Sequence, residues 1–385
     1  MREDSLIIAL LLPLLVTLFW FVELLFSSGE NGKAKKHLAF FMFCGFMSMY
    51  GGYLYFTGLF EPYAISYFVI KTFSFAQLPA FYLYLKSLIQ PTIQWQTYAK
   101  HYFIPLVAGF VAIYFHYIWL SLEESARMFE YLHSPDKLSG REKMAYYFDI
   151  AFRNIYVAMG IFYLLIIHRQ VKLSFKKLLN LCADVETKNP GWISIANMLY
   201  LVFSLFALLL FNLRGEYFQH FRDTYLVIPF LSLGVLFFLI GFKGNRQEMI
   251  AIILKEEVLP PMGPLPEDVR TYLKKNLETA IDQDQLFLKH DICLPDLARH
   301  IGTNRYYLSK LINSEFEMNF NDYINRYRIK TAQNLIVNNK NLSLAEIAIK
   351  SGFKSYISFS RNFKRQVKIS PETFLKSHLE NEERK

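Results

Sequence analysis

Over its first 242 residues the chain alternates between long apolar runs and short polar connections, and it then continues as a mixed, charged sequence to residue 385. A helix needs roughly 20 mostly apolar residues to cross the hydrocarbon layer of a bilayer. Seven runs meet this requirement and predict transmembrane helices over residues 6–26, 38–60, 64–85, 102–120, 147–168, 193–213 and 225–242. The first run is too long for a secretory signal and no small-residue cleavage site follows it, so we expect an anchor.

Basic residues in the connecting loops predict how these helices are oriented. Ten lysines and arginines lie in loops on one side of the predicted bundle and seven on the other. The more basic side of a membrane protein faces the cytoplasm. We therefore expect a multi-pass protein of the inner, cytoplasmic membrane with its N-terminus outside and, after an odd number of spans, its C-terminus in the cytoplasm.

Among the ionisable residues inside the predicted spans, three are candidates for a functional role. Lys71 falls well inside the third span, and Asp149 and Arg153 lie one helical turn apart near the start of the fifth, where they can pair along one face. Charged side chains are costly in hydrocarbon and mark functional positions by default. Two interpretations stay open: a structural ion pair, or a polar ligand pocket around Lys71 that senses an unknown membrane or extracytoplasmic signal.

The junction, residues 243–283, predicts a linker with amphipathic helices. Residues 249–258 have the pattern of a short helix at a membrane surface, and residues 260–266 then break any continuous helix with four prolines and one glycine. These breaks argue against a rigid rod from the last span into the C-terminal part. Apolar residues at steps of four follow over 267–281, which predicts a helix that packs on the C-terminal domain or against a second copy of the chain.

Two segments of the C-terminal part have the pattern of a helix-turn-helix unit, residues 294–312 and 344–363. In each segment an alanine is followed four positions later by a glycine. The small alanine lets two helices cross closely, and the glycine permits the backbone of a sharp turn. Residues 320–337 predict a helix between the two units that spaces them rigidly.

The second helix of each unit is predicted to begin at a capping residue, Thr303 in the first unit and Ser355 in the second. Buried apolar residues on one face would leave polar side chains on the other face, where such a helix can enter the major groove of DNA. These candidate DNA-binding residues are Asn304, Arg305, Tyr306, Ser309, Lys310, Lys354, Ser355, Tyr356, Ser358, Arg361 and Lys364.

Charge adds to this picture through its distribution. The whole chain has a net charge of +9, and residues 284–385 hold 17 lysines and arginines against 11 acidic residues, a net charge of +6. A basic excess in a small domain suits a polyanionic partner such as nucleic acid. A solvated surface accounts for the charge equally well, so the charge supports the helix-turn-helix interpretation without deciding it.

The sequence contains little that indicates catalysis or cofactor binding. The three cysteines, Cys44, Cys182 and Cys293, are far apart, so we expect buried thiols and neither a disulfide nor a zinc site. We find no metalloprotease motif, phosphate-binding loop, metal-spaced histidine cluster or triad-like grouping. The sequence thus predicts no cofactor, no metal and no enzymatic activity.

A resemblance to a known family rests on a series of positions in roughly the last hundred residues. They are Leu297-Ala298, Tyr307-Leu308-Ser309, Tyr323-Ile324-Asn325-Arg326, Arg328-Ile329, Ala332, Ile347-Ala348, Gly352-Phe353, Phe359-Ser360-Arg361, Phe363-Lys364 and Ser370-Pro371. In these positions the chain resembles the AraC-type (AraC/XylS) transcription regulators of bacteria. The resemblance implies that both units insert a recognition helix into adjacent major grooves. It also implies base contacts from Tyr306, Ser309, Lys310, Tyr356, Ile357 and Arg361.

Two departures from the family limit what the resemblance carries over. Many members have a glycine after each recognition helix, where this chain has Glu317 and Lys368, so we expect those helices to end by another cap. In the family a soluble sugar-binding domain often precedes the DNA-binding domain, and here apolar sequence stands in its place. The identity of the effector therefore does not follow from the family.

These patterns predict an all-α protein with four parts: a seven-span bundle (1–242), a juxtamembrane linker (243–283), an AraC-type DNA-binding domain (284–379) and a charged tail (380–385). The leading hypothesis is a membrane-bound one-component transcription regulator controlled by a signal sensed by the membrane domain. Its expected partners are double-stranded DNA, the lipid bilayer, RNA polymerase and a second copy of the chain. Two alternatives remain open: a constitutive tethered regulator, and a transporter- or enzyme-like membrane domain with secondary gene control.

Overall fold

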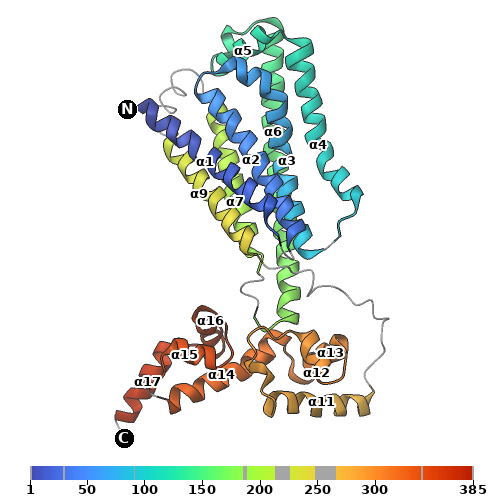
Figure 1. The fold of residues 1–385 in the computed structure, drawn as a ribbon, viewed down its shortest axis with the longest axis vertical. Coiled ribbons are helices and arrows are strands. Elements are labelled where there is room, and N and C mark those ends of the chain that lie inside the picture. Colours follow the sequence, from blue (N-terminus) through green and yellow to red (C-terminus); the bar gives the residue numbers. More distant parts are fainter. Residues whose placement is uncertain are drawn as a thin grey trace. The chain divides into compact units, whose positions relative to one another are not determined.

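The computed structural model describes residues 2–28, 31–90, 92–184, 189–212, 226–247, 266–339 and 341–383. All regular elements in these ranges are helices, which confirms the all-α prediction (Figure 1). The residues group into two units that are not consecutive along the chain. The apolar unit holds the described residues of Met1–Lys172 and Pro190–Ile252, and the C-terminal unit holds those of Leu173–Asn189 and Ile253–Lys385.

Among the described residues, seven helices are long and apolar enough to cross a membrane, which agrees with the number of predicted spans. They are α1 (Arg2–Phe26), α2 (Gly32–Phe56), α3 (Phe60–Ile89), α4 (Trp95–Ile113, continued by a π-helical turn, Tyr114–Trp119), α6 (Gly140–Leu181), α7 (Gly191–Asn212) and α9 (Val227–Arg246). The predicted boundary at Phe60 was wrong, because this residue begins α3 instead of ending α2. Gly58, with φ +77, turns the chain between these two helices.

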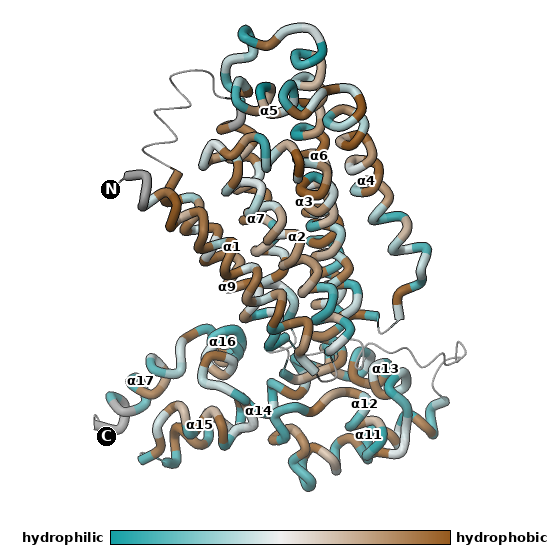
Figure 2. The backbone as a smooth tube through the Cα atoms, turned by 45° about the horizontal axis from the view of Figure 1, so that its top comes forward, coloured by the Kyte–Doolittle hydropathy of each residue, from teal (hydrophilic) through white to brown (hydrophobic). Residues whose placement is uncertain are grey.

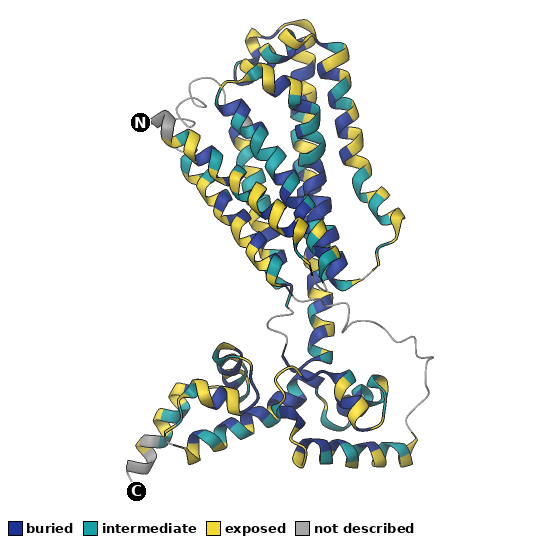
Figure 3. Cartoon of the chain, viewed as in Figure 1, coloured by how far each residue is buried: buried dark blue, intermediate teal, exposed yellow. Residues whose placement is uncertain are grey.

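The helices of the apolar unit run side by side and expose hydrophobic side chains on their outer faces. Brown, hydrophobic stretches in Figure 2 coincide with exposed yellow faces of α1 and α9 in Figure 3. Large apolar residues with 64–80% exposure include Ile8, Phe26, Phe110, Leu165 and Ile228. A protein surrounded only by water rarely exposes so much contiguous apolar surface.

The C-terminal unit contains two helix-turn-helix cores joined by one long helix. The first core takes in α11 (Glu267–Asp282), the 3-10 turn Leu286–Leu288, α12 (Leu294–His300), α13 (Arg305–Phe316) and the first half of α14 (Phe320–Asn338). The second takes in the rest of α14, α15 (Leu344–Lys350), α16 (Tyr356–Val367) and α17 (Pro371–Glu383). Helix α14 is the predicted spacer, and it contributes Tyr323 and Ile324 to the first core and Ile329 and Ala332 to the second.

Helix α11 settles one of the open alternatives for the junction. Its apolar stripe, which includes Leu273, Leu277 and Ile281, is buried in the first core, so it packs on the C-terminal unit. The Arg270 side chain adds a contact by donating from Nε to Glu315 Oε1 of α13 at 2.8 Å. The predicted helix over 249–258 and the prolines before residue 266 lie outside the described residues.

Helix α6 connects the two units without a break. It runs for 42 residues, well beyond the predicted span of 147–168, and from Leu173 onward its residues belong to the C-terminal unit. The sequence pattern indicated only the last span as a possible rigid connection to the C-terminal part. The uninterrupted helix is instead the fifth of the seven apolar helices.

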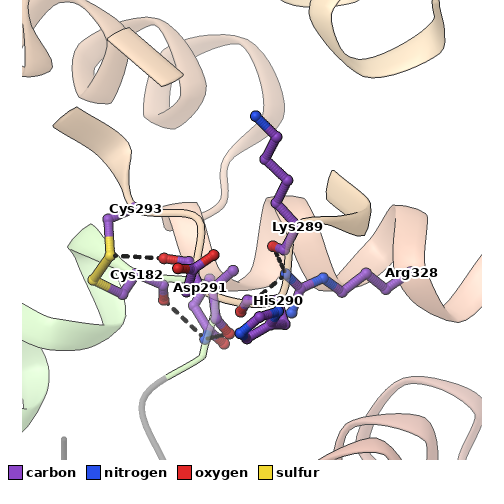
Figure 4. Close-up of a disulfide and its surroundings, with 8 residues drawn as sticks. Cys182, Lys289, His290, Asp291, Cys293 and Arg328 are labelled. Carbon is purple, nitrogen blue, oxygen red and sulfur yellow. Dashed lines mark hydrogen bonds between the residues drawn. A yellow bond between two sulfur atoms is a disulfide. The ribbon is translucent and has the colours of Figure 1, made fainter. Parts of the chain in front are cut away.

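The extension of α6 also corrects the prediction for the cysteines. Cys182 follows the last residue of α6 and forms a disulfide with Cys293, 111 residues later, at the residue before α12 (Figure 4). The prediction of three thiols was therefore wrong for this pair. Cys44 is a buried free cysteine, as expected.

Candidate nucleic-acid interface and charged cluster

The turn of the first helix-turn-helix unit is formed by Gly302 and a capping asparagine. Gly302 has φ +72, a left-handed conformation that suits glycine. Asn304 then adopts an extended backbone, and its side chain accepts a hydrogen bond from the Tyr307 N–H at 2.9 Å. The predicted cap, Thr303, was thus wrong by one residue, because Asn304 occupies the position that precedes the helix.

The second unit is built on the same plan with a longer turn. Helix α15 begins with a capping box formed by Ser343 and Glu346. Gly352, with φ +90, makes the turn, and Ser355 Oγ accepts from the Ser358 N–H at 3.1 Å, which confirms the predicted cap. Three positions separate glycine and cap here, against two in the first unit, so the turn is one residue longer, as its spacing predicted.

The outer face of α13 presents several of the residues predicted to bind DNA. Leu308, Leu311 and Ile312 are at most 1% exposed, which turns the opposite face of the helix outward. Tyr306 is 43% exposed, and the ammonium of Lys310 lies 6.0 Å from its ring centroid. The remaining predicted residues of this unit, Asn304, Arg305 and Ser309, are half-buried.

Helix α16 presents a second such face. Phe359 and Phe363 are fully buried, whereas Ile357 is 62% exposed. Lys354, Arg361 and Lys364 are also exposed, and Ser355 and Tyr356 are half-buried. Ser358 differs from the prediction of an exposed residue: it is 9% exposed, because it lies in the capped first turn beside Phe359.

Both recognition helices end in a left-handed residue that is not glycine. Glu317 follows α13 with φ 53, and Lys368 follows α16 with φ 70. The expectation of a different cap was therefore wrong, since these turns keep the geometry that glycine usually provides. A side chain in this conformation costs roughly 1–2 kcal/mol.

Arg328 of α14 joins the two helix-turn-helix cores. It is fully buried, and its guanidinium donates from Nε to Phe287 O and from Nη2 to Lys289 O, each at 2.7 Å (Figure 4). The same group lies 5.5 Å from the ring centroid of Phe353, which follows the turn of the second unit. Burial lowers the pKa of Arg328 to about 10, and the carboxylates of Asp184 and Asp291 act in the opposite direction. The guanidinium therefore stays charged at neutral pH.

The end of α6 is bound to α14 by two asparagines for which the sequence predicted no contact, although Asn325 is among the positions of the family resemblance. Asn321 Nδ2 donates to Cys182 O at 3.1 Å and to Ala183 O at 2.7 Å, and Asn325 Nδ2 donates to Ala183 O at 3.3 Å. The Ala183 N–H donates to Ile292 O at 3.1 Å. These bonds, all inside the C-terminal unit, make residues 182–183 part of the helix-turn-helix domain. Their only sequence signal was two polar residues one turn apart on the apolar side of α14.

The apolar unit contains the charged cluster that the sequence suggested. Arg153 Nε lies 3.1 Å from Asp149 Oδ2, which confirms the pairing predicted from their spacing. Lys71 Nζ lies 3.2 Å from Asp149 Oδ1, and Tyr67 donates its hydroxyl hydrogen to the same oxygen. One buried carboxylate thus contacts two basic side chains and a tyrosine hydroxyl.

A cavity of about 260 Å³ adjoins this cluster. Its wall includes Lys71, Asp149 and Arg153, and the remaining side chains are mainly apolar and aromatic residues of α2, α3, α6, α7 and α9. An apolar wall with a few convergent polar groups is typical of a small-molecule site. Within the described ranges, no group of three histidine, cysteine or acidic residues could hold a metal ion.

The connection between α4 and α6 reaches the same cluster. Its helix α5 (Leu122–Glu130) starts at a capping box of Ser121 and Glu124. Phe129 of α5 is buried, with its ring centroid 4.8 Å from that of Tyr67. The connection between α4 and α6 thus contacts Tyr67, a residue that binds Asp149.

Comparison with known proteins shows what the C-terminal part is similar to. Residues 297–377 match the family described as a helix-turn-helix domain. The Msm operon regulatory protein of Streptococcus mutans is 35% identical over 138 residues, which are 36% of this chain and 48% of that protein. The regulatory protein PocR of Salmonella typhimurium is 29% identical over 119 residues, 31% of this chain and 37% of that protein.

A third relative is the transcriptional regulatory protein HptR of Staphylococcus aureus, 31% identical over 96 residues, 25% of this chain and 37% of that protein. The chain thus spans 37% to 48% of the length of these relatives. No solved structure matches the chain. The matches confirm the resemblance to AraC-type DNA-binding domains for the C-terminal part, and such a domain implies a double-stranded DNA partner.

Proposed function

We propose that the chain is a membrane-bound bacterial transcription regulator that reads DNA with two recognition helices under the control of a signal acting on the apolar unit. The observation that carries this proposal is one chain that joins an AraC-type domain to seven apolar helices. The names of the relatives, all regulatory proteins and none an enzyme, support a role in gene control.

The bilayer is the proposed environment of the apolar unit. Its outward-facing hydrophobic side chains support this placement. Lipid tails would cover this apolar surface, whereas its exposure to water would be unfavourable. The DNA partner requires the C-terminal unit in the cytoplasm, and the basic loops favour the same orientation. The four parts proposed from the sequence are then a transmembrane bundle, a linker, a DNA-binding domain and a tail. The end of α6 is added to the DNA-binding domain.

We assign the base contacts to the outer faces of α13 and α16. In this assignment Tyr306, Ser309 and Lys310 read one major groove, and Tyr356, Ile357 and Arg361 read the next. Exposed lysines such as Lys354 and Lys364 would bind phosphates, which position the protein without specifying sequence. RNA polymerase and a second copy of the chain complete the proposed partners.

The sensing site in this proposal is the cluster of Lys71, Asp149 and Arg153 with its cavity. Two observations favour sensing over a passive tether. The cluster couples α3 to α6 through a buried carboxylate, and α6 itself continues into the C-terminal unit. A ligand that rearranges the ion pairs would therefore act on the helix whose end is bound to α14.

The DNA assignment is tested with the full chain in lipid nanodiscs. A binding site is first selected from random DNA, and the affinity of Arg361→Ala for it is then compared with that of Lys376→Ala, an exposed control on α17. Loss of a base contact should weaken specific binding by roughly 5- to 150-fold, or about 1–3 kcal/mol, and relax selectivity at one position. Equal affinity and selectivity of the two variants would remove Arg361 from the interface.

The sensing assignment is tested by Asp149→Asn, which keeps the shape of the side chain and removes its charge. RNA profiling of cells should show the regulated genes fixed at one level, whereas Glu23→Gln, an exposed carboxylate on α1, should respond like the parent. Normal regulation in Asp149→Asn cells would favour the constitutive tether. The full chain is needed, because a fragment starting near residue 265 would lack the α6 end that α14 binds.

A further inference from the structure

The end of α6 is held on the first helix-turn-helix unit by two kinds of bond. Hydrogen bonds from Asn321 and Asn325 hold the carbonyls of residues 182–183, and the Ala183 N–H bonds to Ile292 O. The disulfide of Cys182 and Cys293 adds a covalent bond at the same place (Figure 4). Since Cys293 immediately precedes α12, this bond fixes the end of α6 to the first helix of the unit.

The surroundings of this pair show that the attachment matters to the domain. Ala183 belongs to the first core, and Cys182 and Cys293 are 0% and 7% exposed. The neighbouring Asp184 acts electrostatically on Arg328, the guanidinium that joins the two helix-turn-helix cores. Detachment of residues 182–184 would therefore uncover part of the first core and remove a countercharge from Arg328.

The compartment decides how such a pair behaves. A cytoplasmic domain lies among thiol reductants, and the disulfides found there in most bacteria are transient, catalytic or redox-sensing. This argument rests on the proposed function, which places the C-terminal unit in the cytoplasm. Under that condition a buried pair at the attachment point of α6 would alternate between thiols and disulfide.

We propose that Cys182 and Cys293 are a redox modification site, a reversible lock between the end of α6 and the first helix-turn-helix unit, set by low-molecular-weight disulfides of the cell. The Cys293 thiolate attacks one sulfur of the small disulfide, and a mixed disulfide forms as one small thiolate leaves. The Cys182 thiolate then attacks Cys293 Sγ and expels the second small thiolate. The two protein thiols are oxidised, their two protons pass to the two thiolates, and the small disulfide is reduced to two thiols.

The redox state of the cysteine pair decides whether a displacement of α6 reaches the first recognition helix. In the oxidised chain the end of α6 cannot leave α12, so any displacement of α6 reaches the first recognition helix. In the reduced chain the hydrogen bonds from α14, the bond from the Ala183 N–H to Ile292 O and the packing of Ala183 hold it, and these contacts can open. The burial of both sulfurs means that exchange requires this opening, so the rate of oxidation itself reports how firmly the α6 end is docked.

The state of the lock is measured first in intact cells, with the full chain in its membrane. Cells are treated with a membrane-permeant small disulfide or a reductant, quenched with acid and labelled with a maleimide that shifts mobility. In the Cys44→Ala background, two labels should attach after reduction and none after oxidation. After reduction one label should attach to each of the further variants Cys182→Ser and Cys293→Ser, whereas after oxidation Cys182→Ser should keep the small thiol on Cys293 as an unresolved mixed disulfide and take none.

The consequence is measured on the same chain in nanodiscs, with selected DNA, in oxidised and reduced glutathione. We expect the affinities of the two states to differ about fivefold or more, as for a typical allosteric coupling, with Cys44→Ala behaving like the parent and either serine variant insensitive to glutathione. Cysteines that stay oxidised in reduced cells, or affinities that do not depend on their state, would overturn the lock while leaving the proposed function intact. Absence of specific DNA binding in both states would instead overturn the proposed function and the lock with it.

Discussion

The two helix-turn-helix units share a local plan and differ in what is attached to them. Each has an alanine and a glycine four residues apart, a side-chain cap and a left-handed final residue. The first core also includes α11 and Ala183 at the end of α6, whereas the second is built from α14 to α17. The first unit is thus the one that contacts α6 and α11, the segments that precede the two helix-turn-helix units in the chain.

This difference assigns separate tasks to two similar folds. The first unit packs against the α6 end and α11, and α14 links it to the second unit, because α14 belongs to both cores. Arg328 and the turn at Gly352 connect the two units, because both contact the segment around Phe287 in the first core. A helix-turn-helix unit can therefore serve as a docking platform without giving up its recognition face.

The largest expected effect separates the two turn glycines. A Cβ on Gly352 would lie 2.8 Å from Leu288 Cα and 2.8 Å from Phe287 O, whereas one on Gly302 would meet nothing within 4 Å. Gly352→Ala should cost about 3 kcal/mol or more from overpacking and left-handed strain together, and Gly302→Ala about 1–2 kcal/mol from strain alone. Hydrogen exchange of α15 and α16 in the full chain measures the difference. Equal costs would show that the second turn does not rest on the first unit.

A smaller effect is expected at the docking site of α6. Asn321→Ala removes the amide that donates to two buried carbonyls and should cost about 1–3 kcal/mol. Amides of residues 178–184 should then exchange faster. Asn334→Ala, at an exposed position of the same helix, serves as the control. If both variants leave that exchange unchanged, α14 does not hold the α6 end.

Replacing the left-handed residue that follows α13 or α16 by glycine should stabilise each unit by a similar free energy. Glu317→Gly and Lys368→Gly remove left-handed strain, and each should raise the free energy of unfolding by about 0.5–1 kcal/mol. Denaturant titration, followed by exchange in α13 and α16, measures both. A loss of stability in one variant only would show that its side chain has a further role, such as the bond from Lys368 Nζ to Arg365 O.

The smallest expected effect is a pH dependence confined to the first unit's contact with α11. Hydrogen bonds from Arg270 and Lys274 hold the pKa of Glu315 below its usual value. The resulting stability is present above the usual carboxylate pKa and is lost as the pH falls through the lowered value. Exchange in α11 should accelerate on acidification in that range. Glu315→Gln should abolish the dependence, and an unchanged pH profile in that variant would assign it to other groups.

Features governed by local spacing were predictable. Periodicity placed seven apolar helices, the spacer α14 and the Asp149–Arg153 pair, because each depends on residues within a few helical turns. The contact of Lys71 with Asp149 and the Cys182–Cys293 disulfide join distant segments, so no local pattern contained them. The sequence also placed the cap at Thr303 instead of Asn304, since both residue types cap helices well and only the backbone decides.

The length of α6 was the most consequential omission. Hydropathy detects the part of a helix that suits lipid, and it does not detect a polar continuation such as the end of α6 after His168. The basic residues beyond that point predicted an ordinary cytoplasmic loop. The packing of Ala183 into the first core and the hydrogen bonds of residues 182–183 show that the segment is part of the DNA-binding domain.

The central claim is that one chain reads specific DNA while it resides in the membrane. The most direct measurement cross-links living cells, floats their membranes on a density gradient and sequences the DNA attached to the protein. We predict that the parent chain retains a small set of genomic fragments and that Arg361→Ala, at equal abundance in the membrane, loses them. Recovery of the same unselective DNA with both proteins, or of the parent only outside the membrane fraction, would contradict the account.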